Sequence, residues 1–82
     1  MFDIEFSKYS EKQFYKLEKF AQQRIISTLE RIRVRPYPHV KKLVGCPYFR
    51  LRVGDYRLII DIKESKMIIY VLEVGHRKNI YQ

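Results

Sequence analysis

The sequence contains a single cysteine, Cys46, so it cannot form an intramolecular disulfide bond. Its two histidines, His39 and His76, lie far apart in the chain and have no cysteine pair beside them, so the spacing of a metal site is missing. No apolar run approaches the ~20 residues that span a bilayer, and the amino terminus alternates apolar with acidic residues, unlike a signal peptide. These absences predict a cytoplasmic protein in a reducing compartment, with neither metal nor cofactor.

Acidic residues are also scarce, because 9 aspartates and glutamates stand against 17 lysines and arginines, giving a formal net charge of +8. Such an excess predicts attraction to polyanions, with nucleic acid as the first expectation, an acidic protein second and an anionic membrane third. The 82 residues suffice for one domain, residues 1–82. The hydrophobic fraction of 46% is enough for a packed core without disulfides.

The hydrophobic periodicity predicts one strand, then two helices, then three strands. The predicted segments are a strand over 2–6, a helix that begins between Ser7 and Ser10, a helix over about 21–34, and strands over 48–53, 56–62 and 67–74. The last strand is apolar on both faces except at Glu73, which is typical of a central strand. We therefore predict an α+β fold, with both helices packed on one face of a mainly antiparallel four-stranded sheet and the other face exposed and basic.

Capping residues and prolines mark the predicted helix boundaries. Ser10 and Gln13 have the spacing of a capping box at the start of the first helix. Only a brief break near residues 19–20 separates the two helices, which predicts an αα-hairpin, with one continuous bent helix as the alternative. Two prolines end the second helix, and residues 36–47 are predicted to form a connector.

The pair Gly54-Asp55 separates two alternating runs and predicts a two-residue hairpin turn, with Gly54 at positive φ. In that register Arg52 lies directly opposite Arg57. Like charges that face each other across a hairpin cost up to roughly 1 kcal/mol. We interpret their presence as the mark of an anion-binding face, whereas a solvated polar face is the simpler alternative.

The candidate binding face combines positive and aromatic side chains. Four of them share one face of the predicted hairpin by strand alternation, namely Tyr48, Arg50, Arg52 and Arg57. The tail that follows Gly75 is expected to reach the same face, and it supplies His76, Arg77, Lys78 and Tyr81. Arginine forks bind phosphate oxygens and aromatic rings stack on bases, so this set suits single-stranded RNA. The tail residues could equally be solubilising charges or pack at the edge of the core.

A second basic group is predicted to bind either a phosphate backbone or acidic residues of a partner, and it comprises Arg31, Arg33, Arg35, Lys41 and Lys42.

The sequence resembles the RelE-type toxins of the RelE/ParE superfamily. Residues 51–59, LRVGDYRLI, are similar to a family core of the form L-R-x-G-x-Y-R followed by a hydrophobic residue. Residues 74–81 match a V-G-x-R ending with a later tyrosine, and Lys42-Leu43-x-Gly45 is a third, weaker match. The resemblance covers nearly all of the chain and implies a single RelE-like domain with the order strand, two helices and three strands.

The resemblance implies the toxin of a type II toxin–antitoxin system, an mRNA interferase that cleaves mRNA in the ribosomal A site. It further implies that a cognate acidic, RelB-like antitoxin holds the toxin inactive in a hetero-oligomer. In such endoribonucleases the substrate 2′-hydroxyl attacks the adjacent phosphate and leaves a cyclic phosphate and a 5′-hydroxyl. By motif position, Arg57 and Arg77 would bind the scissile phosphate. Tyr81 would stack on a base, and Arg50 stands where the family has a lysine.

The sequence departs from the family at its acid–base groups. Tyr48 stands where the family has a second lysine, and Arg50 stays protonated and is therefore a poor general base. His76 carries the kind of side chain that titrates near neutral pH and is the reserve candidate. Residues assigned to RNA binding without a catalytic role are Arg52, Tyr48, His76 and Lys78. Two other functions stay open, namely a ParE-like toxin that poisons DNA gyrase and a non-catalytic module that binds RNA or the ribosome.

Overall fold

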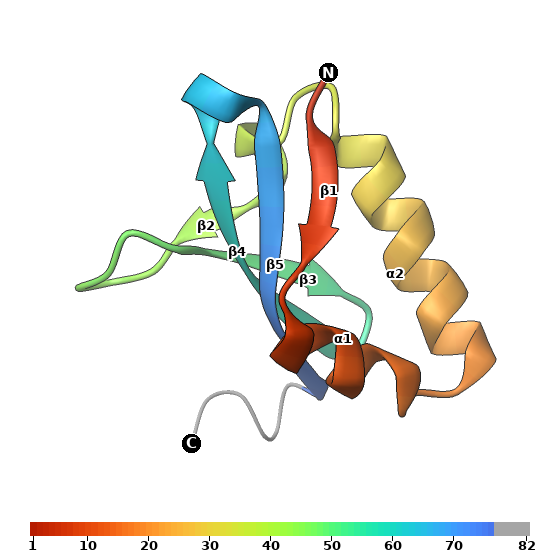
Figure 1. Ribbon diagram of the computed structural model, residues 1–82. Coiled ribbons are helices and arrows are strands. Elements are labelled where there is room, and N and C mark those ends of the chain that lie inside the picture. Colours follow the sequence, from red (N-terminus) through yellow and green to blue (C-terminus); the bar gives the residue numbers. More distant parts are fainter. Residues whose placement is uncertain (77–82) are drawn as a thin grey trace.

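The computed structural model describes residues 1–76 of the chain (Figure 1). Its helices and strands are β1 (Asp3–Phe6), α1 (Lys8–Tyr15), α2 (Lys19–Ile32), β2 (Lys41–Lys42), β3 (Phe49–Val53), β4 (Tyr56–Lys63) and β5 (Ile68–His76). Two short 3₁₀ helices are η1 (Tyr37–His39) and η2 (Glu64–Lys66). The α+β fold and the predicted order of one strand, two helices and three long strands are confirmed.

The strands form one five-stranded sheet in the order β1-β5-β4-β3-β2. β5 lies between β1 and β4, which confirms the central position that its apolar character predicts. The pairing is antiparallel except between β1 and β5, which run parallel. The predicted count of four strands is wrong because β2 was assigned to the connector. Two residues are too few to show the alternation that identifies a strand.

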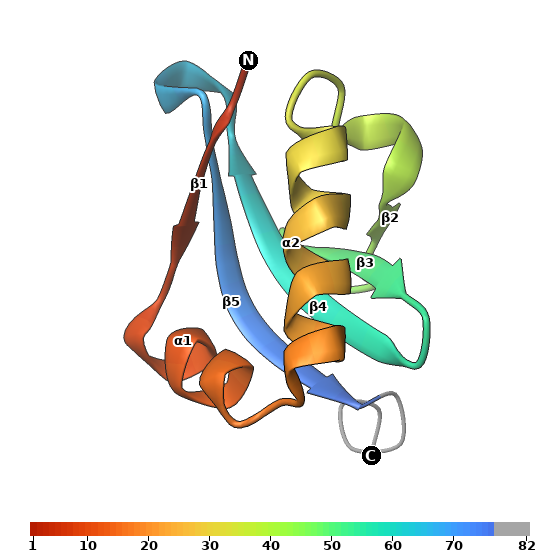
Figure 2. The ribbon, with the colours of Figure 1, turned by 90° about the vertical axis from the view of Figure 1, so that its right-hand side faces the viewer.

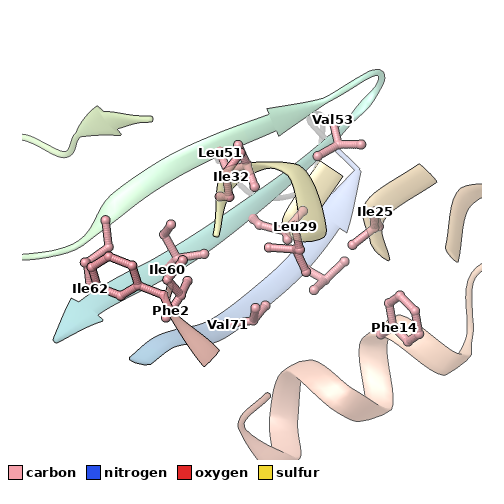
Figure 3. Packing of buried hydrophobic residues seen from close by; sticks show 13 residues of the cluster. Phe2, Phe14, Ile25, Leu29, Ile32, Leu51, Val53, Ile60, Ile62 and Val71 are labelled. Atoms are coloured by element: carbon pink, nitrogen blue, oxygen red, sulfur yellow. The ribbon is translucent and has the colours of Figure 1, made fainter. Parts of the chain in front are cut away.

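Both helices cover the same face of the sheet, and α2 crosses in front of β4 and β3 in Figure 2. The side of α2 that faces the sheet carries Ile25, Leu29 and Ile32, each at most 1% exposed. Figure 3 shows these side chains against the strand residues and Phe14 of α1. Burying one such aliphatic side chain contributes about 1.5–3 kcal/mol, so this contact fixes α2 on the sheet. No helix of residues 1–76 covers the opposite face of the sheet, and we call it the open face.

The start of α1 differs from the predicted capping box. Ser7 is the N-cap, because its hydroxyl accepts the Ser10 backbone N–H at 3.0 Å. Ser10 is instead buried and donates to the Val71 carbonyl at 2.6 Å, while Oε1 of Gln13 accepts the Val74 N–H at 2.7 Å. These contacts follow from the length of β1, which ends before Ser7 and leaves the rest of the β5 edge unpaired. Polar side chains of α1 therefore hydrogen-bond the backbone groups that this edge leaves unpaired.

The two helices are separate, which confirms the predicted αα-hairpin, and the break lies at residues 16–18 rather than at 19–20. Nε2 of Gln22 donates to the Leu17 carbonyl at 2.9 Å and closes the connection. α2 ends at Ile32, and the next side chain, Arg33, donates from Nε to the Phe2 carbonyl at 2.6 Å. Within residues 1–76, no helix is long and apolar enough to span a membrane.

Candidate nucleic-acid interface

The hairpin between β3 and β4 has the predicted turn and register. Gly54 has φ +58°, and Arg52 pairs with Arg57 just as Val53 pairs with Tyr56. A Cβ atom at Gly54 would lie 2.9 Å from Nη1 of Arg24, whose guanidinium covers the turn from α2. The positive φ is therefore the main reason that this position requires glycine. The Arg24 guanidinium also leaves little room for a side chain there.

Strand pairing places four cationic side chains together on the open face. Lys41 pairs with Arg50 and Arg52 pairs with Arg57, and directly paired residues of neighbouring strands share a face. Leu51, between the two β3 arginines, is 2% exposed and points to the helices, which fixes the direction of the arginines. We call Lys41, Arg50, Arg52 and Arg57 the cationic patch. It draws on β2, β3 and β4 and lies at the hairpin end of the sheet.

The other end of the open face is acidic, which corrects the expectation of a uniformly basic face. Tyr70 of β5 pairs with Glu5 of β1 on one side and with Asp61 of β4 on the other. Asp61 also forms an ion pair with Lys63, with Nζ and Oδ2 3.3 Å apart. A polyanion is therefore attracted to one end of the open face and repelled from the other.

The surroundings of Arg57 are set by β5. Arg57 pairs with Gly75, so no side chain of β5 lies directly beside it. The Nε atom of Arg57 is buried. Glu73, two positions before Gly75, shares the open face because it pairs with Ile59, which in turn pairs with Arg50. Glu73 was not among the predicted site residues, although alternation along β5 from Gly75 places it on this face. The patch is thus bordered on β5 by one half-buried carboxylate.

A hollow of about 280 Å³ adjoins the cationic patch at the β2 edge of the sheet. Its lining comes from η1, β2 and β3 and comprises Pro38, His39, Val40, Lys41, Arg50 and Arg52. His39 was not among the predicted site residues, because residues 36–47 were interpreted as an irregular connector with no assigned face. The structure therefore adds an imidazole to the border of the predicted arginine face.

Tyr37 holds this border in place. Its ring meets the Phe49 ring of β3 edge-on, with ring centroids 5.8 Å apart. Burial, together with the charge and hydrogen bond of the Glu64 carboxylate, raises the pKa of the Tyr37 hydroxyl. The position of η1, and so of His39, is fixed by contacts to β3 and η2.

The remaining predicted site residues do not all lie on the open face beside Arg57. Tyr48 directly precedes β3 and is exposed, and its carbonyl accepts the Leu43 N–H at 3.0 Å. His76 pairs with Tyr56, with ring centroids 5.7 Å apart, so it lies on the helix side of the sheet and not beside Arg57. The expectation that His76 shares the arginine face is therefore corrected. The predicted site residues of the tail, Arg77, Lys78 and Tyr81, lie outside the described residues.

Metal-binding clusters are absent from the described part of the chain, where no three histidine, cysteine, aspartate or glutamate side chains are grouped to hold an ion.

Comparison with known proteins decides the family. The model of a family described as the ParE toxin of type II toxin–antitoxin system, parDE, matches residues 4–81. The chain belongs to this family of type II toxins, within the RelE/ParE superfamily. Among individual proteins, the toxin is 29% identical over 80 residues to a RelE-like toxin protein of Escherichia coli, a match that covers 94% of this chain and 84% of the relative.

Solved structures show the same fold as the toxin. The RelBE2 toxin–antitoxin complex of Mycobacterium tuberculosis matches with a TM-score of 0.86 and 22% identity, covering 93% of this chain and 98% of that one. The RelE–RelB complex of Pyrococcus horikoshii matches at 0.81 and 25% identity, over 95% and 97% of the two chains. The RelB–RelE complex of Methanococcus jannaschii matches at 0.74 and 28% identity, over 94% of each chain.

Proposed function

We propose that this toxin is a ribosome-dependent mRNA endoribonuclease that acts in the cytoplasm and cleaves in the ribosomal A site. The observation that carries the proposal is the cationic patch, in which cations from three strands converge on one open sheet face. Such a face suits the sugar–phosphate backbone of a single strand, because guanidinium forks match phosphate oxygens. The likeness to RelE toxins supports mRNA as the substrate.

In the proposed reaction, the ribose 2′-oxygen attacks the adjacent phosphorus while its proton passes to a base. The bond from phosphorus to the 5′-oxygen breaks, and a proton returns to that oxygen. The products are a cyclic phosphate and a 5′-hydroxyl. Arg57 is assigned to the scissile phosphate, because it matches the family motif and lies on the open face directly opposite Arg52, where its charge would stabilise the transition state. The family resemblance adds Arg77 as a second phosphate ligand and Tyr81 as the base-stacking residue.

Proton transfer cannot be assigned to the arginines, which stay protonated. Glu73 is the carboxylate that borders Arg57 on the open face, and we assign it as the candidate proton acceptor. Most of the rate enhancement is nonetheless expected from positioning and from the arginine charges, since the transition state carries additional negative charge on the phosphoryl oxygens.

We also propose a cognate acidic antitoxin as the partner. Complexes of RelE with RelB are among the structural relatives, and a net charge of +8 favours an acidic protein. Tyr15 and Phe20 are each 68% exposed on the helical side, which offers apolar contacts for an amphipathic partner segment. Growth arrest on expression, relieved by a small acidic neighbouring protein, supports this partner. A harmless protein that is stable alone contradicts it.

The test is primer extension on mRNA translated in a reconstituted system with the purified chain. Codon-phased cuts are expected, and Arg57→Ala is expected to slow cleavage by about 10²–10³, the loss typical of one transition-state donor. Lys66→Ala removes an exposed charge from the turn at the acidic end and serves as the matched control. Translation arrest without cuts would favour a binding module, and inhibition of DNA supercoiling would favour a gyrase poison. Either result would overturn the nuclease.

A further inference from the structure

The hollow beside the cationic patch has a composition that points to an anionic ligand. Three of its six lining residues are permanent or near-permanent cations, namely Lys41, Arg50 and Arg52, and a fourth is the imidazole of His39. No carboxylate of residues 1–76 lines it. Its volume of about 280 Å³ falls at or below the lower limit of drug-sized pockets, which is roughly 300 Å³, and suits a group as small as a phosphate with part of its sugar.

The walls of the hollow are supported by packing. Tyr37 fastens η1 through its ring contact with Phe49 and its hydrogen bond to Glu64, so His39 is carried on an anchored turn. On the strand side, Lys42 points to the helix face and lies 5.7 Å from the Phe49 ring centroid, which turns its neighbour Lys41 to the open face. The loop after β2 projects away from α2 and borders the open face (Figure 1). His39 and Lys41 therefore have defined positions on one edge of the patch.

We propose that this hollow is a second phosphate subsite for single-stranded RNA, with Lys41 and His39 as its specific ligands. The inference rests on the proposed function, because it extends the path of the same RNA strand. Neighbouring strands lie about 4.8 Å apart, so β2 and β4 are separated by roughly 10 Å. A phosphate held by Lys41 is therefore a different one from the phosphate assigned to Arg57. Arg50 and Arg52 lie on β3 between the two positions.

An acidic segment of a protein partner would also be attracted by these charges, but the surroundings favour RNA. A partner helix binds mainly by burying apolar side chains, and four exposed ones lie on α1 and α2, namely Tyr9, Tyr15, Phe20 and Ile26. The hollow is instead lined by Lys41, Arg50 and Arg52, and cationic grooves of this kind follow the backbone of single-stranded nucleic acid.

The test measures binding of a fluorescein-labelled single-stranded RNA decamer by anisotropy over a range of salt concentrations. Every ribose carries a 2′-O-methyl group, so that no 2′-hydroxyl is present to react. Lys41→Ala is expected to reduce the slope of log K against log salt by about 0.7, the value for one phosphate contact in single strands. If the two proteins bind equally at 1 M salt, this change in slope corresponds to about a fivefold loss of affinity at 0.1 M salt. Lys66→Ala, with an equal loss of charge at the far end of β4, is expected to leave the slope unchanged.

His39 provides an independent measurement, because its imidazole lines the hollow from η1 and not from a strand. The charged groups that line the hollow around it are Lys41 on β2 and Arg50 and Arg52 on β3. A ring N–H can donate to a phosphate oxygen, so His39→Ala is expected to lower the affinity for the decamer. The thermal midpoint is expected to stay unchanged, since His39 is exposed.

An unchanged slope in Lys41→Ala, or an unchanged affinity for the decamer in His39→Ala, would contradict the proposed subsite. So would a selective loss of binding to a fluorescent glutamate decamer with RNA binding intact, because the hollow would then be a protein site. The two proposals fail separately. RNA binding with the expected slope changes but no cleavage would reject the nuclease alone, whereas cleavage with unchanged slopes would reject the subsite alone.

Discussion

Arg52→Gln is expected to stabilise the fold and to weaken RNA binding at the same time. Arg52 is exposed on the open face and lies directly opposite Arg57 in the hairpin. In the absence of a bound anion the two like charges repel each other, and a neutral side chain removes that repulsion. The same substitution removes one of the four cations of the patch, so RNA loses a phosphate contact.

The size of the stabilisation follows from the register. Directly paired residues have Cβ atoms about 4.5–5.5 Å apart, and two unit charges about 5 Å apart in water interact by about 0.8 kcal/mol. The flexible arginine stems let the guanidinium groups separate, so this value is an upper limit. For a domain of this size, 1 kcal/mol shifts the thermal midpoint by about 4–8 °C, so Arg52→Gln is expected to raise it by up to about 3–6 °C.

The assay is thermal unfolding followed by circular dichroism in about 0.01 M and 1 M salt, where the Debye length is roughly 30 Å and 3 Å. The gain is expected at low salt and is expected to vanish at high salt. Lys66→Gln is the matched control, because it lowers the net charge equally at the opposite end of β4. A lower midpoint for Arg52→Gln, or a gain that persists at high salt or appears equally in the control, would show that repulsion between Arg52 and Arg57 does not destabilise the fold.

Three further substitutions test the elements that support the site. Gly54→Ala places a side chain at φ +58° and is expected to cost about 1–2 kcal/mol in urea unfolding, with a smaller cost for Gly54→Asn; equal costs would count against backbone strain as the cause. Ser7→Ala removes the N-cap of α1 and is expected to cost about 1 kcal/mol, with Ser7→Asp restoring most of it; a neutral Ser7→Ala would show that the cap is dispensable. Because the Tyr37 pKa is raised in the folded state, its contribution to stability is full below the unfolded value of about 10 and is lost as pH rises through the folded value, so Tyr37→Phe is expected to flatten the alkaline fall in stability. Identical pH profiles for the two proteins would contradict that assignment.

The hairpin could be predicted from the sequence because its signals are local. The Gly54-Asp55 pair and the alternation on both sides of it determine the turn, the register and the shared face of Arg52 and Arg57. Local signals were weaker at the start of α1, where Ser7 and Ser10 both fit a cap. Ser7 and not Ser10 is the N-cap, because the Ser10 hydroxyl instead donates to the Val71 carbonyl of β5.

Features that depend on distant pairing could not be predicted. β2 has two residues and becomes a strand only because β3 accepts it as a neighbour, so neither Lys41 nor His39 could be assigned to a face from the sequence. The acidic end of the open face arises in the same way, since Glu5 reaches it through the parallel pairing of β1 with β5. The position of His76 was mispredicted because β5 continues through Gly75, which was interpreted as the end of that strand.

An NMR titration of the isotopically labelled toxin with the 2′-O-methyl RNA decamer tests whether single-stranded RNA binds at the cationic patch. We expect the largest amide shift changes among residues 1–76 to occur at Lys41, Arg50, Arg52 and Arg57, with little change along α2. Changes concentrated on the helices, or at the Glu5 and Asp61 end of the open face, would contradict it.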